Sequence, residues 1–470
     1  MSPQVPVPLW LDCDPGHDVS WRPICLLGLK ERHARLPRFV FAATIRGREV
    51  AESESPPAIT TPHSHLIPPP GDLTRHALTK TLILYISQKD AFAILLAAYH
   101  PAIRLLGIST VFGNASLKNT TYNARSILTA IGKHTSVKVY PGAAKALARE
   151  ELHAPTDIHG ESGLDGTALL PPPQCEADTS VPAVDAMAAA LRAQPAGTAW
   201  VVATGCMTNV AALFRRHPDL AARVAGVSAM GGAVGGDFTP APRGEVDGAE
   251  RIGNWTPFAE FNILADPEAA AFVLQHPVLA PKTTLVPLDI THLVLATAEV
   301  QELLLYGPPS PAEGDDRVAA REQRSGPGRS TLRRMLVELL NFFADTYARV
   351  FGIAEGPPLH DPIAVAVALI GLPGGHEIPF YEYDPRLGGD DEAAAAAVNK
   401  RERFDVTVVT EGTYAEAKVG AQTGRTVAKL LPPGSEGVRI PRSLDIPRFW
   451  RVIEECLERA DEANAKNGVY

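Results

Sequence analysis

The chain has 470 residues, of which 45% are hydrophobic, and it carries a net charge of −9 at pH 7. Because nucleic acids and anionic membrane surfaces select basic faces, a chain this acidic is expected to bind neither. Three further features predict a reduced, soluble, cytosolic protein: five scattered cysteines without CxxC or zinc spacing, an N-terminus unlike a signal peptide, and no apolar run near the ~20 residues that span a bilayer.

Short apolar runs alternate with amphipathic segments along the chain. The expected strands are Pro8–Leu11, Leu105–Phe112, Val137–Tyr140, Ala199–Ala203, Val224–Met230 and Thr284–Leu288. The expected helices are Asp90–Tyr99, Tyr122–Gly132, Ala183–Ala193 and Asn209–Arg215. This alternation predicts a Rossmann-like α/β fold, an open, mixed, mainly parallel sheet flanked by helices. We expect one domain over residues 1–470.

Three segments interrupt this alternation. Tyr306–Ser330 and Gly388–Arg403 are polar and are predicted to be surface loops. The third, Val19–Lys89, contains ten Lys and Arg residues against five Asp and Glu, eight prolines and four histidines. No sustained helical or strand period runs through it, so we expect a disordered insertion in an otherwise acidic chain.

Polar side chains follow several of the predicted strands. Asp12 and Asp14 follow the first strand, Asn114 follows the second, and Thr204 and Asn209 follow the strand in AWVVATGCMTN. In open parallel sheets, binding sites form at the carboxyl ends of the strands. Carboxylates and amides gathered at that edge predict a pocket for a hydroxyl-rich ligand.

The segment EFNILADPEAA contributes further polar groups. Glu260 and Asn262 lie two residues apart, so an extended backbone would point both side chains to the same side. Asp266 is then expected to cap a helix that has Pro267 at its first position.

The segment LHDPIAVAVAL places His360 and Asp361 directly before an apolar helix. Hard cations such as Ca²⁺ take six to eight oxygen ligands, mainly from carboxylates, carbonyls and water. A cluster of aspartates with few cysteine or histidine ligands therefore fits Ca²⁺ or Mg²⁺ better than zinc.

These motifs together resemble one family, the inosine–uridine-preferring nucleoside hydrolases. The motifs, in chain order, are DCDPGHD, DAFAILLAA, TVFGN, HGESGLDG, TGCMTN, MGG, GNWTPFAEFNILADPEAA and HDP. The resemblance covers most of the chain outside the three interrupting segments, and the pairing of DxDPGxDD with EFNxxxDPEAA is the specific part. It implies calcium-dependent hydrolysis of purine and pyrimidine ribonucleosides to ribose and free base in nucleoside salvage. It also implies a homodimer or homotetramer.

The resemblance also implies roles for individual residues. Asp14 would bind Ca²⁺ and act as general base on the attacking water, and Asp90, Asp361 and the Thr204 carbonyl would complete the protein ligands. His360 would protonate the departing base. The residues that would contact the nucleoside are Asp18, Asn114, His159, Asn254, Glu260, Phe261 and Asn262.

The chemistry of glycosidic cleavage supports these residue types. Breaking the C–N bond builds positive charge on the sugar, which nearby carboxylates and amide oxygens stabilise. A bound Ca²⁺ eases deprotonation of water. A positioned acid typically contributes about 10²–10⁴-fold, and histidine is suited to that role near neutral pH.

The insertion separates two acids that are adjacent in the family. Deleting Val19–Lys89 joins Asp18 directly to Asp90 and gives LDCDPGHDDAFAILLAAYHP. The segment begins with Val-Ser, which codons typical of a 5′ splice site would encode, so we interpret it as translated intron. If it is present in the protein, we expect weak or no activity unless its ends re-close, because a small misplacement at a catalytic site costs about 10²-fold.

Less specific interpretations exist for each motif. Asp12, Asp14 and Asp18 could form only a capped turn, since aspartate favours caps and turns, and DxD also occurs in phosphotransfer enzymes. His360 and Asp361 could simply cap a helix. Two functional alternatives remain: hydrolysis of another N-riboside such as nicotinamide riboside, and a catalytically impaired relative that binds nucleoside or calcium.

Overall fold

The structure is a computed structural model, in which the chain is described over residues 5–16, 89–150, 167–246, 248–309, 326–342, 344–383 and 401–468. These residues fall in one compact unit, formed by residues 1–20 together with 83–470. Nearly all of the 19–89 segment, and most of the loops predicted at 306–330 and 388–403, lie outside the described residues. The division of the whole chain into domains therefore stays a prediction.

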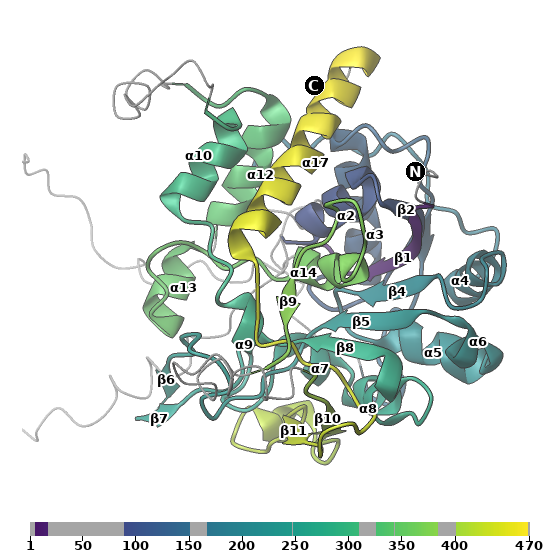
Figure 1. Ribbon diagram of the computed structural model, residues 1–470, viewed down its shortest axis with the longest axis vertical. Coiled ribbons are helices and arrows are strands. Elements are labelled where there is room, and N and C mark those ends of the chain that lie inside the picture. The colour runs from purple at the N-terminus through teal and green to yellow at the C-terminus, as the bar shows by residue number, and fades with distance from the viewer. Residues whose placement is uncertain are drawn as a thin grey trace, which may run out of the picture. The chain divides into compact units, whose positions relative to one another are not determined.

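A six-stranded sheet runs through the centre of this unit, in the order β3-β2-β1-β4-β5-β8 (Figure 1). Every neighbouring pair in it is parallel, which confirms the Rossmann-like fold. Its strands are β1 (Val7–Cys13), β2 (Ile103–Thr110), β3 (Val139–Pro141), β4 (Trp200–Ala203), β5 (Gly226–Met230) and β8 (Thr283–Val286).

The antiparallel component that was predicted for this sheet lies elsewhere. In the described residues, antiparallel strand pairs form three separate two-stranded sheets. They are β6 (Glu245–Val246) with β7 (Ala249–Glu250), β9 (Phe380–Tyr381) with β12 (Ser443–Leu444), and β10 (Phe404–Val408) with β11 (Thr426–Leu430).

Alternate side chains of β1 enter different hydrophobic cores on the two faces of the sheet. Leu9 and Leu11 pack in one core and Trp10 in the other, as expected for a strand buried on both faces. The first core includes residues of α2 (Asp90–Tyr99), α3 (Leu117–Ala130), α12 (Thr331–Asn341), α14 (Asp361–Ala366) and α17 (Ile446–Asn467). The second includes α4 (Ala183–Arg192), α5 (Thr208–Arg216), α6 (Asp219–Arg223) and α8 (Pro267–Gln275).

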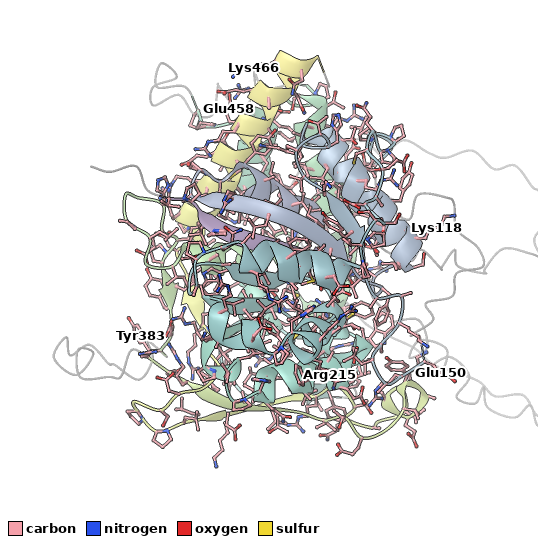
Figure 2. The ribbon with its side chains drawn as sticks, turned by 90° about the vertical axis from the view of Figure 1, so that its right-hand side faces the viewer. Lys118, Glu150, Arg215, Tyr383, Glu458 and Lys466 are labelled. Carbon is pink, nitrogen blue, oxygen red and sulfur yellow. The ribbon has the colours of Figure 1, made fainter. Side chains whose placement is uncertain are left out.

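The remaining α-helices of the described residues are short. None of the described helices is both long and apolar enough to cross a membrane. Exposed charged residues such as Lys118 on α3, Arg215 on α5 and Lys466 on α17 lie on the outer surface of their helices (Figure 2). These short helices are α7 (Phe261–Ala265), α9 (Leu288–Thr291), α10 (Ala298–Tyr306), α13 (Ala344–Phe351) and α16 (Tyr414–Ala417).

Most predicted elements are confirmed to within a few residues, and α2 has the predicted bounds. The largest shift is at α3, which begins at Leu117 rather than Tyr122. Its start is set by Ser116, whose side chain accepts a hydrogen bond from the Asn119 backbone amide. The first turn, LKNTT, is mostly polar, so the apolar periodicity begins only after the helix has started.

Helix α2 follows the insertion and begins without a side-chain cap. Its N-cap residue is Lys89, which makes no capping hydrogen bond, and the helix is buried over nearly its whole surface. The first backbone amides of a helix have no partner within it, and the side chain of a Ser, Thr, Asp or Asn at the N-cap normally accepts a hydrogen bond from one of them. Joining Asp18 to Asp90 would place a favoured capping residue at this position.

We therefore expect deletion of Val19–Lys89 to leave the folded unit at least as stable as the full chain. The aspartate cap contributes about 1 kcal/mol, and a shorter loop costs less entropy to close. Urea unfolding followed by circular dichroism measures the difference. A deletion variant that is clearly less stable would show that the segment contributes to folding.

Candidate functional site

Three aspartates meet at the carboxyl edge of the sheet. Asp14 follows β1, Asp90 begins α2 and Asp361 begins α14, and all three are buried. Burial is the main cause that raises the pKa of Asp14 and Asp361, and the charge of Asp90 raises both further. The backbone amide of Asn114 donates to Asp14 (3.0 Å) and the Thr204 hydroxyl donates to Asp90 (2.7 Å). Like charges buried together in this way favour a bound cation.

Asp12 belongs to a different network, on the other side of β1. Its Oδ1 accepts hydrogen bonds from the Ser109 hydroxyl (2.5 Å) and the Asn209 amide (2.8 Å), and Trp10 donates to the same Ser109 hydroxyl (2.9 Å). Burial raises the pKa of Asp12 to about 7, against the effect of these two hydrogen bonds. Asp12 therefore fastens β1 to β2 and α5, and Asp14 is the acid that faces the site.

The Thr204 carbonyl, predicted as a metal ligand, also lies at this edge. Thr204 follows β4, and its backbone amide donates to the Asp12 carbonyl (2.8 Å). The side-chain amide of Asn262 donates to the Thr204 carbonyl (3.0 Å) and to the Met230 carbonyl (3.1 Å). Asn262 thus bridges the ends of β4 and β5.

The extended backbone considered for Glu260 and Asn262 is present at Glu260 but not at Asn262, which lies in the helix α7. Glu260 is the N-cap of α7, and its carboxylate accepts from the backbone amides of Gly232, Asn262 and Ile263. A carboxylate that satisfies the free amides of a helix start favours the helix over a strand. Burial raises the pKa of Glu260 to about 7, although these backbone hydrogen bonds lower it. Asp266 caps α8 with Pro267 in its first turn, as predicted.

Asn254 and Phe261 lie beside this helix start. The side-chain oxygen Oδ1 of Asn254 accepts a hydrogen bond from the Phe261 backbone amide (2.9 Å), while the buried side-chain nitrogen of Asn254 has no hydrogen-bond partner. A buried amide without a partner is costly, and a ligand hydroxyl would satisfy it. The Phe261 ring packs against Trp255, with 4.8 Å between the ring centroids.

His360 occupies the N-cap position of α14 but does not cap the helix. It is fully buried, with its Nε2 2.7 Å from the Tyr347 hydroxyl and its Nδ1 2.5 Å from the Thr291 hydroxyl. Burial lowers the pKa of His360 well below its usual range, and the nearby Lys89 acts in the same direction. A neutral imidazole at this position needs a partner to supply a proton.

A second histidine packs against this group. The ring of His292 lies 5.6 Å from that of His360 and 5.2 Å from that of Phe351, measured between centroids. Its Nδ1 is 2.8 Å from the Pro242 carbonyl, which can only accept, so Nδ1 carries the proton. Burial lowers the pKa of His292 to about 3.

The local sequence does not mark several residues of this site. Tyr347 lies in α13 outside any of the quoted motifs, and Lys89 was assigned to the insertion. Thr291 and His292 follow β8, at the carboxyl edge of the sheet where binding sites form. Their position after a predicted strand was the one sequence signal that could have indicated them. Two predicted contacts, Asp18 and His159, lie outside the described residues.

The donors at this edge suit a hard cation. No group of three or more His, Cys, Asp or Glu side chains in the described part of the chain forms a ready-made metal site. The three buried carboxylates and the Thr204 carbonyl are nevertheless all oxygen donors, and a cation would relieve the repulsion among the carboxylates. The other ligands of a cation that takes six to eight oxygens would be water and substrate hydroxyls.

Comparisons with known proteins point to one family. The family described as inosine-uridine preferring nucleoside hydrolase matches residues 86–451. Uridine nucleosidase of Saccharomyces cerevisiae is 37% identical over 377 residues, which cover 79% of this chain and 94% of that protein. Pyrimidine-specific ribonucleoside hydrolase RihA of Salmonella arizonae is 36% identical over 280 residues, covering 59% of this chain and 75% of the relative.

Solved structures share the fold. A purine-preferring ribonucleoside hydrolase from Gardnerella vaginalis superposes with a TM-score of 0.56 at 22% identity, over 80% of this chain and 96% of that chain. A plant nucleoside hydrolase gives 0.55 at 23% identity, over 78% and 95%. At these identities the likeness supports the fold alone.

The low pKa of His292 predicts a specific pH dependence of stability. The unfolded chain binds a proton at this histidine below pH 6.5, whereas the folded chain does so only near pH 3. The contribution of His292 to the free energy of unfolding is therefore fully present above pH 6.5 and is lost as the pH falls toward 3. From pH 7 to pH 5 the stability advantage of wild type over His292→Gln should shrink by roughly 2 kcal/mol.

Urea unfolding of both proteins at the two pH values measures this change. Because other titrating groups are common to both proteins, only the difference between them is informative. A difference that does not change with pH would show that His292 is protonated to the same extent in the folded and unfolded chains.

Proposed function

Because the chain belongs to the family of inosine-uridine preferring nucleoside hydrolases, we propose that it hydrolyses the N-glycosidic bond of ribonucleosides to give ribose and free base. The observation that carries the proposal is the meeting of Asp14, Asp90 and Asp361 beside the Asn262–Thr204 contact and the buried His360. This arrangement provides acids for a cation and for water, and polar groups for a sugar.

Uridine is the substrate we propose first. Two relatives that align with this chain are named for uridine or for pyrimidine nucleosides. Activity on uridine should be compared with activity on inosine and on nicotinamide riboside, which carry a purine and a pyridinium at the same sugar carbon. We further propose that the protein is cytosolic and forms a homodimer or homotetramer.

The cation we propose is Ca²⁺, held by the carboxylates of Asp14, Asp90 and Asp361 and by the Thr204 carbonyl. An all-oxygen donor set supports it over zinc. When bound, it would orient a water molecule and make that water easier to deprotonate.

The protein groups would then act on a bound nucleoside as follows. Asp14 takes a proton from the attacking water, whose oxygen forms the new bond to C1′. The C1′–N bond breaks, its electron pair stays with the base, and His360 helps deliver a proton to that base. Asn254, Glu260 and Asn262 hold the ribose hydroxyls and stabilise the positive charge that develops on the sugar. Asn114 and Phe261 are further proposed contacts of the nucleoside, as are Asp18 and His159, which lie outside the described residues.

We expect the full chain to release ribose from uridine when Ca²⁺ is present and to stop when a chelator removes it. A reducing-sugar assay measures the release, and restoring Ca²⁺ should restore it. A folded chain that binds ribose analogues without releasing ribose would instead support the impaired relative. In that case the variant lacking Val19–Lys89, in which Asp18 adjoins Asp90, should gain activity.

We expect His360→Gln to lower kcat on uridine by about 10²–10⁴-fold, the contribution of a positioned acid. On 4-nitrophenyl riboside the loss should be small, because nitrophenolate leaves without a proton. Steady-state kinetics on both substrates measure the contrast. Asp14→Asn is the matched comparison, since loss of the base should slow both substrates. An equal loss on both substrates with His360→Gln would contradict the role of His360 as the acid.

A further inference from the structure

Lys89 is a buried lysine at the edge of the site. Only 3% of it is exposed, and its Nζ donates a hydrogen bond to the Tyr347 hydroxyl at 2.7 Å. The same nitrogen lies 4.4 Å from the centroid of the Tyr347 ring. Lysine is rarely buried without a partner. The Tyr347 hydroxyl is the hydrogen-bond partner of Lys89, and nearby Asp361 supplies an opposite charge.

The hydrogen bond from Lys89 sets the direction of the bonds beyond it. The lysine donates, so the Tyr347 oxygen accepts and its own hydrogen is directed toward its other neighbour, Nε2 of His360. Nε2 then accepts, so Nδ1 carries the imidazole proton and donates to the Thr291 hydroxyl. The partner of one ring nitrogen thereby fixes the tautomer of the whole ring.

We propose that Lys89 is a positioning residue for protonation of the departing base, because it holds the Tyr347 hydroxyl against His360. This inference rests on the proposed function. As the C1′–N bond breaks, the base keeps the electron pair and takes the proton that lies between Tyr347 Oη and His360 Nε2. The attacking water passes its proton to Asp14 and its oxygen to C1′. Exchange with solvent then returns a proton to the Tyr347–His360 pair and removes one from Asp14.

The position of Lys89 gives this proposal a consequence for the insertion. Lys89 is the last residue of the segment that separates Asp18 from Asp90. In the full chain that segment therefore supplies a side chain to the site. Deleting the segment changes both Lys89 and the spacing of the two acids, so single substitutions in the full chain are the appropriate test.

The test is kinetics of the full chain with Ca²⁺ on uridine and on 4-nitrophenyl riboside. Lys89→Met keeps the aliphatic length and removes the donor, and should lower kcat on uridine by about 10-fold or more, within the 10²–10⁴-fold that a positioned acid contributes. Activity on 4-nitrophenyl riboside should stay within about 2-fold, because that leaving group needs no proton. If Lys89→Met does not fold, Lys89→Gln replaces it. Glutamine keeps an amide donor on a shorter side chain, so it should also lower kcat on uridine and not on 4-nitrophenyl riboside, but by a smaller factor.

A double-mutant cycle with Tyr347→Phe tests whether Lys89 acts through the tyrosine. Tyr347→Phe keeps the ring and removes the hydroxyl, so it should show the same loss on uridine alone. The double variant should then be no slower than Tyr347→Phe, because residues that act through one contact are not additive. Full additivity would mean that Lys89 acts by another route.

Lys133→Met is the matched control. The Nζ of Lys133 lies 4.2 Å from the centroid of the Tyr99 ring, a similar lysine–tyrosine contact at the far end of α2. This control should leave both activities unchanged.

Besides full additivity in the double-mutant cycle, four outcomes with an active chain would overturn the proposal. They are equal losses on the two substrates with Lys89→Met, no loss at all with Lys89→Met, a comparable loss with Lys133→Met, and a wild-type chain that cleaves only 4-nitrophenyl riboside. In the last case the chain would still cleave the bond to the sugar, and only the protonation of the base by Tyr347 and His360 would be contradicted. A folded wild-type chain that cleaves neither substrate would overturn the proposed function, and this inference with it.

Discussion

The burial of three like charges within reach of one another is the constraint on which the rest of the structure depends. Asp14, Asp90 and Asp361 come from three separate elements, and each carboxylate raises the cost of ionising the next. Such a group persists only where the surrounding fold leaves it no other position. The central strand β1 and the buried helices α2 and α14 provide that restraint, because all three pack in one core.

Polar contacts between the elements also hold the edge of the sheet together. Asp12, Ser109 and Asn209 join β1, β2 and α5, and the Asn262 amide joins the ends of β4 and β5. Buried hydrogen bonds between separate elements make such an edge rigid. The two aspartates of LDCD differ in role because Asp12 is the penultimate residue of β1, whereas Asp14 lies beyond the end of the strand, where the backbone no longer follows its alternation.

The acid end of the site is built differently, from aromatic packing and a short chain of hydrogen bonds. Lys89, Tyr347, His360 and Thr291 are linked in that order, and His292 packs against two of them. A neutral imidazole in dry surroundings can pass on a proton only through such a partner. The carboxylate end and the acid end therefore meet across the base of α14, where His360 and Asp361 are consecutive.

The sequence by itself determined the six strands, helix α2, the capped start of α8 and the family, because these depend on local periodicity, capping and motifs. It also named most residues now found at one edge. Only the tertiary structure decided that Glu260 caps a helix, that Asp12 and Asp14 belong to different hydrogen-bond networks, and that Lys89 and Tyr347 join the site. The Lys89–Tyr347 contact spans 258 residues of chain, and no local pattern encodes a pairing that depends on how distant elements pack.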